Sequence, residues 1–284
     1  MEVRNVDLYE AFGMERRGAA GGRLTCMTWR PLEEAGVGRE SPAVLILPGG
    51  GYCMTSEREA EAVALQFSAL GYQTFVLAYS CAPSVFPTAL RECAMAMTYI
   101  RRSAKDLGVI PNMVAAVGFS AGGHLCGTLG TLYDSPEVAD IAPAEWIRPD
   151  ALGLSYPVAV SWGSTHEGSF QALCGENRDL RSRLSLEKLV RPDMPPVFLW
   201  HTRDDGAVPV RNSLILAQAM EEKGVSFALH IYRSGPHGVS LANELVYPAN
   251  HPPVCSRDVS GWQRAMADFW AECGFACRDR GGPL

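Results

Sequence analysis

The sequence contains no apolar run of about 20 residues, the length that a helix needs to cross a bilayer. Its first seven residues also lack the apolar core of a secretory signal. Neither a membrane span nor export is therefore expected, and the sequence predicts a cytoplasmic protein.

Positive charge is also scarce. The 284 residues carry 25 Lys and Arg against 31 Asp and Glu, a net charge of −6, and no basic run stands out. Contacts with phosphates supply much of the affinity of proteins for nucleic acids, and this chain offers no obvious source of them. The sequence therefore predicts neither nucleic acid nor a membrane as a partner. It leaves the oligomeric state open, a homo-oligomer included.

Closely spaced cysteine pairs are missing as well. The nine cysteines are odd in number and scattered along the chain. Cys273 and Cys277 lie four positions apart but have no second pair, which a zinc site of this kind requires. We expect no metal site, and buried free thiols in a reducing compartment.

No internal repeat or low-complexity linker divides the chain, so residues 1–284 are expected to form one domain. Apolar runs alternate with helix-compatible segments, a pattern typical of the α/β class with a mainly parallel sheet and helices on both faces. A polar segment, 164–196, is expected to be a small cap insertion. The predicted strands are 24–29, 43–47, 74–79, 114–117, 153–158, 197–201 and 227–232.

Two local patterns carry further expectations. The alternation over 24–29 predicts an edge strand. Ser56 followed by Glu59 predicts a capping box at the start of a helix, which Gly71 would end.

The segment Gly118–His124 reads Gly-Phe-Ser-Ala-Gly-Gly-His and follows the apolar run 114–117. A G-x-S-x-G sequence between a strand and a helix is typical of a nucleophile elbow, a turn so tight that glycines must flank the serine. Ser120 is therefore the predicted nucleophile. It would lie at a helix N-terminus, which favours developing negative charge.

A serine hydroxyl needs a base, and His237 is the predicted one. It lies in Ser234–Gly238, just past a predicted strand, among small residues that allow another loop to approach. His124 is too close to Ser120 along the chain and is expected to tie down the turn. The other histidines are the loop residues His166 and His251, kept as reserve candidates, and the strand residues His201 and His230, expected to be core groups.

The base needs an anionic partner, and two aspartates follow the predicted strand 197–201. We prefer Asp205 and keep Asp204 as the alternative. One of the two is expected to accept backbone N–H groups in its own loop instead.

Three consecutive glycines, 49–51, end the buried run 43–47. Backbone N–H groups of Gly50, Gly51 and Ala121 are predicted to form an oxyanion hole. A phosphate cradle is the weaker interpretation, because no Lys-Ser/Thr pair follows and the spacing is not G-x-G-x-x-G. Tyr52, at the mouth of this loop, is the predicted wall of a substrate pocket.

Together these segments resemble the α/β-hydrolase superfamily of esterases and lipases over nearly the whole chain. The bacterial acetylesterase-like group, often labelled acetyl xylan esterases or sugar-ester hydrolases, is the most similar. Its Ser-Asp-His order matches Ser120, Asp205 and His237, and Pro48 stands where hormone-sensitive-lipase-like esterases carry histidine. The resemblance rests on the segments 47–52, 118–124, 201–209 and 235–238.

The resemblance implies a serine hydrolase that cleaves short-chain esters through an acyl-enzyme. It further implies a small-molecule ester as partner, such as an acetylated carbohydrate, and no cofactor or metal. A serine peptidase or a lactone hydrolase on the same fold is the alternative, and a non-catalytic binding protein a third. No long amphipathic lid is apparent, which favours a soluble substrate.

Overall fold

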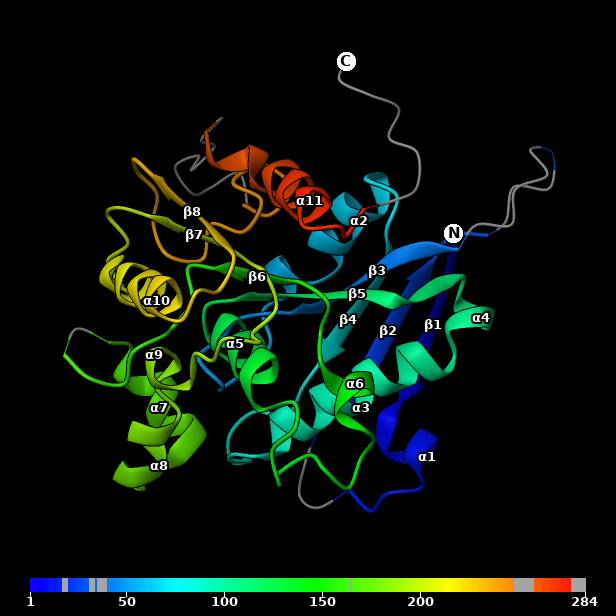
Figure 1. The fold of residues 1–284 in the computed structure, drawn as a ribbon, viewed down its shortest axis with the longest axis horizontal. Coiled ribbons are helices and arrows are strands. Elements are labelled where there is room, and N and C mark those ends of the chain that lie inside the picture. The colour runs from blue at the N-terminus through cyan, green and yellow to red at the C-terminus, as the bar shows by residue number, and fades with distance from the viewer. Residues whose placement is uncertain (17–19, 31–33, 35–39, 164, 248–257, 277–284) are drawn as a thin grey trace.

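One mixed sheet organises the computed structural model, which describes residues 1–284 except 17–19, 31–33, 35–39, 164, 248–257 and 277–284. The strand order is β1-β2-β4-β3-β5-β6-β7-β8 (Figure 1). The strands are β1 (Glu2–Asp7), β2 (Arg23–Thr28), β3 (Ser41–Leu47), β4 (Gln73–Ala78), β5 (Val109–Phe119), β6 (Leu152–Ser155), β7 (Val197–Thr202) and β8 (Phe227–Tyr232).

Most of the sheet is parallel, as predicted. The strands β4, β3, β5, β6, β7 and β8 pair in parallel, whereas β2 pairs antiparallel with β4 and with β1. The prediction of an edge strand at 24–29 was wrong, because β1 covers that edge. β1 has no apolar run, since Glu2, Arg4 and Asn5 interrupt it and most of its residues are only partly buried or exposed.

Helices cover both faces of the sheet (Figure 1). Alternate residues of β3 divide the core: Val44 and Ile46 pack in the cluster with α2 and α11, and Leu45 and Leu47 in the cluster with α3, α5 and α10. This two-sided burial explains why the predicted strand was a continuous apolar run. The helices are α1 (Leu8–Phe12), α2 (Glu61–Ala69), α3 (Thr88–Arg102), α4 (Ala104–Leu107), α5 (Ala121–Leu132), α6 (Ala144–Ile147), α7 (Glu167–Cys174), α8 (Arg178–Arg183), α9 (Leu186–Leu189), α10 (Arg211–Glu222) and α11 (Trp262–Glu272).

The segment 165–196 carries the three short helices α7, α8 and α9 and packs beside α5. Leu186 donates its N–H to Ala159 O at 2.8 Å, and its side chain lies against Gly127. That this segment acts as a cap stays a prediction.

Two predictions of element boundaries were wrong. The capping box at Ser56 is absent, because its side chain makes no cap hydrogen bond and a short 3-10 helix, Glu57–Glu59, precedes α2. β6 ends at Ser155 rather than 158, because Tyr156 turns the chain with a φ of 37° and Pro157 follows. No helix in the described ranges combines the length and apolar character needed to cross a bilayer.

Candidate active site

Ser120 occupies a strained turn between β5 and α5. Its φ is +53°, a region that residues other than glycine rarely adopt. A Cβ on Gly118 would lie 2.0 Å from Gly122 O, and one on Gly122 would lie 2.1 Å from Leu47 O. Both glycines are therefore required by close backbone approach, as the elbow pattern predicted.

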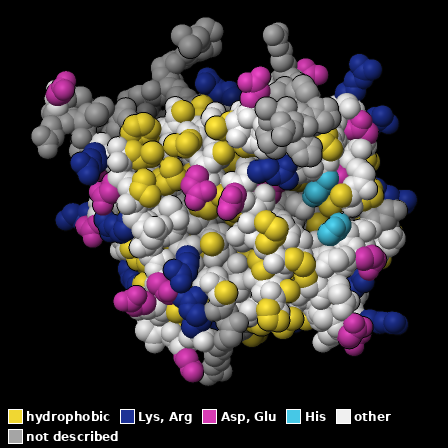
Figure 2. All heavy atoms as spheres, turned by 180° about the vertical axis from the view of Figure 1, so that it is seen from behind, with side chains coloured by type: hydrophobic (Ala, Val, Ile, Leu, Met, Phe, Trp, Pro, Cys, Tyr) yellow, Lys and Arg dark blue, Asp and Glu magenta, His cyan; other side chains and the backbone are white. Residues whose placement is uncertain are grey.

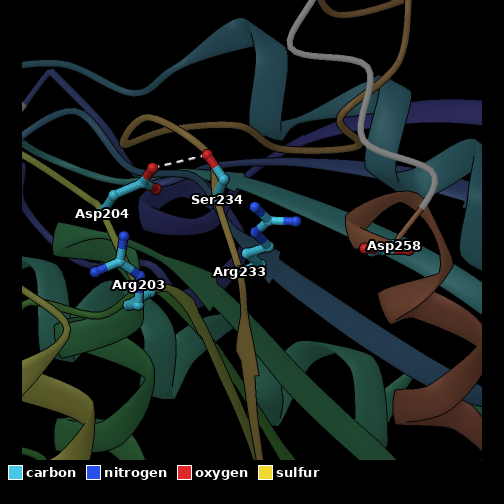
Figure 3. Close-up of a pocket in the computed structure, with 5 residues that line it drawn as sticks. All are labelled: Arg203, Asp204, Arg233, Ser234 and Asp258. Atoms are coloured by element: carbon cyan, nitrogen blue, oxygen red, sulfur yellow. Dashed lines mark hydrogen bonds between the residues drawn. The ribbon is translucent and has the colours of Figure 1, made fainter.

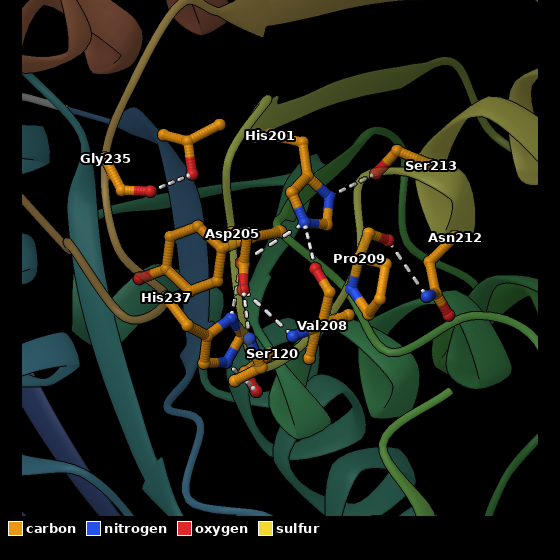
Figure 4. A network of polar contacts seen from close by, with 12 residues as sticks. Ser120, His201, Asp205, Val208, Pro209, Asn212, Ser213, Gly235 and His237 are labelled. Atoms are coloured by element: carbon orange, nitrogen blue, oxygen red, sulfur yellow. Dashed lines mark hydrogen bonds and ion pairs between the residues drawn. The ribbon is translucent and has the colours of Figure 1, made fainter. Parts of the chain in front are cut away.

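The structure brings the three predicted catalytic side chains together (Figure 4). His237 Nε2 lies 2.8 Å from Ser120 Oγ, and His237 Nδ1 lies 2.7 Å from Asp205 Oδ2. Because a carboxylate only accepts, His237 donates through Nδ1, which leaves Nε2 to accept the serine proton. Ser120, Asp205 and His237 come from the ends of β5, β7 and β8, so the parallel sheet itself places them at one edge.

Asp205 is surrounded by donors. Its Oδ1 accepts N–H groups of Ala207 and Val208, each at 2.9 Å, while its Oδ2 also lies 3.3 Å from His201 Nε2. Burial would raise the pKa of this carboxyl, but hydrogen bonds from His201 and His237 hold it well below its usual range. Asp205 is therefore ionised at neutral pH.

Asp204, the alternative partner, has a different task. Its Oδ2 accepts the Ser234 hydroxyl and its Oδ1 the Gly235 N–H, both at 2.7 Å. These bonds fasten the loop after β7 to the loop that carries His237. Asp204 and Ser234 also line a pocket of about 450 Å³ with Arg203, Arg233 and Asp258, in which no predicted catalytic residue takes part (Figure 3).

The glycine loop lies against the serine. A Cβ on Gly49 would be 3.0 Å from Ser120 Cβ, and one on Gly50 would collide with Met54 O at 2.2 Å. Gly50 and Gly51 have φ values of +126° and +67°. Within the described ranges, no hydrogen bond uses the N–H groups of Gly50, Gly51 or Ala121. That these three N–H groups form an oxyanion hole stays a prediction.

Tyr52 is placed differently from its predicted role. Its side chain is only 2% exposed, and its hydroxyl donates to His124 Nδ1 at 2.8 Å. His124 Nε2 in turn donates to Leu184 O at 2.7 Å. His124 therefore ties the glycine loop to the segment 165–196, and Tyr52 is a support of the loop rather than an open pocket wall.

This arrangement makes stability depend on pH. Burial lowers the pKa of His124 to about 4 from 6.5, so the unfolded chain binds a proton between these values that the folded chain does not. The contribution of His124 to the free energy of unfolding is fully present above pH 6.5 and is lost as the pH falls toward 4. Between pH 7 and pH 5, His124 is expected to lower the free energy of unfolding by about 2 kcal/mol.

Urea denaturation of the wild type and of His124→Gln at both pH values measures this cost. The variant has lost the titrating group, so its free energy of unfolding should fall by about 2 kcal/mol less than that of the wild type. Equal pH dependence of the two proteins would contradict the assignment.

A buried carboxyl that the sequence analysis missed joins two loops of the site. Glu59 accepts the Gly49 N–H at 2.8 Å and the Tyr156 hydroxyl at 2.5 Å, and Tyr156 Oη accepts the Ser240 N–H at 3.0 Å. Burial raises the pKa of Glu59, against these hydrogen bonds. The Tyr156 ring also packs edge-on to His237, with centroids 5.2 Å apart. Glu59 was expected to cap a helix, and no local pattern distinguishes the two tasks.

The other histidines in the described ranges take no part in the contact with Ser120. His201 is buried, donates through Nε2 to Val208 O at 2.8 Å and binds Ser213 Oγ through Nδ1, which agrees with a satisfied core group that also meets Asp205. His251 lies outside the described residues. Across those residues, no group of three or more His, Cys, Asp or Glu side chains is placed to hold a metal ion.

Comparison with known families agrees with this geometry. Residues 97–249, more than half of the chain, match the model of the prolyl oligopeptidase family, and residues 33–145 match the model described as BD-FAE. Among solved structures, the acetyl ester-xyloside bifunctional hydrolase of Caldicellulosiruptor lactoaceticus is 33% identical. It superposes with a TM-score of 0.81 over 96% of this chain and 97% of that one.

Two curated relatives are longer than this chain. Endo-1,4-beta-xylanase B of Butyrivibrio fibrisolvens is 37% identical over 71% of this chain and 33% of its own length. Acetylxylan esterase of Xylanibacter ruminicola is 28% identical over 79% of this chain and 45% of its own length. The chain thus spans between a third and a half of the length of these two relatives.

Proposed function

This chain belongs to the α/β-hydrolase superfamily, through the prolyl oligopeptidase family model that covers more than half of it, and on that premise we propose that it is a serine esterase. Its proposed substrates are short-chain carboxylic esters, above all acetyl groups on carbohydrates. The observation that carries the proposal is the continuous contact from Ser120 Oγ through the His237 ring to Asp205. Relatives named for acetylxylan and acetyl xyloside hydrolysis support the substrate class.

The first half of the proposed reaction forms an acyl-enzyme. Ser120 Oγ attacks the ester carbonyl carbon while His237 Nε2 takes the hydroxyl proton. The carbonyl oxygen becomes an oxyanion and accepts the N–H groups of Gly50, Gly51 and Ala121. The bond to the alcohol oxygen then breaks, and His237 returns its proton to the departing alcohol.

The second half regenerates the enzyme. A water molecule attacks the acyl carbon and gives a proton to His237, the bond to Ser120 Oγ breaks, and that proton returns to the serine. Asp205, held ionised by its donors, stabilises the imidazolium in both halves. No residue of this scheme needs a cofactor.

One observation favours amide hydrolysis as a second candidate, namely the match to a family described by a peptidase. A panel of substrates separates the two. We expect kcat/KM to be highest for p-nitrophenyl acetate and acetylated xylose, to fall with longer acyl chains, and to be negligible for peptide p-nitroanilides and lactones. Activity confined to the anilides would overturn the esterase proposal.

The proposal includes a cytoplasmic location and one domain with a small cap. Free thiols support the location: Cys26, Cys93, Cys126 and Cys174 are buried and unpaired by disulfides. The packing of α9 against α5 supports a cap that is part of the same domain rather than a separate unit.

A further inference from the structure

His166, the reserve candidate for the base, lies next to the glycine loop of the site. It precedes α7 and is half-buried. A Cβ built on Gly51 would be 3.7 Å from His166 Cε1, so the imidazole lies beside the proposed oxyanion loop. Histidine side chains also reach the surface close to one another on the face shown in Figure 2.

The hydrogen bonds of His166 fix which nitrogen carries its proton. Nδ1 accepts the Ser169 N–H at 3.3 Å and lies 2.8 Å from Ser169 Oγ. Nδ1 therefore caps the helix as an acceptor, and the proton of the neutral ring is on Nε2. In the described part of the chain, no hydrogen bond uses that Nε2–H group.

The charge state and place of the ring agree with a ligand contact. Burial lowers the pKa of His166, and the positive charge of a protonated His237 lowers it further. The ring is therefore a neutral donor at neutral pH, and it is close enough to His237 to sense its charge. In the proposed reaction His237 protonates the departing alcohol, and on that ground we place His166 on the side of the site from which the alcohol leaves.

We propose that His166 binds the alcohol part of the ester, with Nε2–H donating a hydrogen bond to a hydroxyl group of a sugar. The inference rests on the proposed function and assigns a specificity residue to the same site. A half-exposed donor beside the glycine loop suits a polyhydroxylated alcohol, whereas an apolar alcohol would leave it without a partner. Helix capping accounts for Nδ1 but not for the unused donor.

The test compares two acetate esters that share an acyl group. The alcohol released from methyl xyloside monoacetate is a sugar with free hydroxyls. The group released from p-nitrophenyl acetate is a phenol without an alcoholic hydroxyl. For His166→Ala we expect kcat/KM to fall about 3- to 10-fold on the xyloside, the worth of one neutral hydrogen bond, and to change little on the phenyl ester. His166→Gln, which keeps an N–H donor, should recover part of the loss.

The outcomes are distinct. If the wild type hydrolyses both esters and His166→Ala loses activity equally on both, or on neither, the inference is wrong and the esterase proposal stands. If the wild type hydrolyses neither ester, the proposed function fails and the inference with it. Retained activity on p-nitrophenyl acetate also reports that the variant has folded.

Discussion

Ser120→Ala is expected to lower kcat for p-nitrophenyl acetate by a factor on the order of 10⁵ to 10⁶. The hydroxyl removed is the group that His237 Nε2 contacts, so the variant loses the proposed nucleophile. The N–H groups of the glycine loop remain, so a small residual rate above that in water should persist. Steady-state kinetics, together with covalent labelling by a fluorophosphonate, measures the effect.

Folding should survive this change. The substitution removes one oxygen and keeps the Cβ, so the strained backbone at φ +53° is neither relieved nor worsened. The wild type should be labelled and the variant not, with similar unfolding midpoints. Activity of the variant above about 1% of wild type, far outside the expected range, would remove Ser120 from its proposed role.

Asp205→Asn is expected to lower kcat by a factor on the order of 10⁴. Four N–H groups surround the carboxylate, from Ala207, Val208, His201 and His237. An amide NH₂ must therefore face donors in either orientation. With the NH₂ toward His237, the ring is driven to the tautomer that cannot accept the serine proton; with it toward the backbone, two N–H groups lose their acceptor.

The matched control is Asp204→Asn, one position earlier. Asp204 faces one backbone N–H and the Ser234 hydroxyl, which can rotate to donate or accept. An asparagine there can satisfy both contacts, so kcat should stay within about tenfold of wild type while Asp205→Asn falls by orders of magnitude. The reverse order would make Asp204 the partner of His237.

The sequence alone predicts the serine turn and the strand ends, because there the residue types follow directly from the backbone geometry. Gly118 and Gly122 are demanded by contacts near 2 Å, so the serine turn is visible in the residue types themselves. The strand ends were visible because buried parallel strands are uninterrupted apolar runs, and the topology then gathers their following loops at one edge. Ser120, His237 and Asp205 could be chosen from that placement.

Tertiary contacts were not visible in the same way. Glu59 stands three positions after Ser56, the spacing of a capping box, yet its carboxylate serves Gly49 and Tyr156 from other elements. A half-buried β1 with Glu2 and Arg4 gives no strand signal, because its stability comes from pairing with β2. Tyr52 reads as an exposed loop aromatic, and only its hydrogen bond to His124 shows that it faces inward.

His124 also limits how this protein can be re-engineered. A segment grafted from another hydrolase in place of 165–196 would remove the Leu184 carbonyl and leave a buried imidazole N–H without its acceptor, at a cost of about 1–3 kcal/mol. The disturbance would pass through the ring to Tyr52 and so to the neighbouring glycines. Chimeras built to accept larger acyl groups therefore need a replacement carbonyl at that point, or a matching change at position 124.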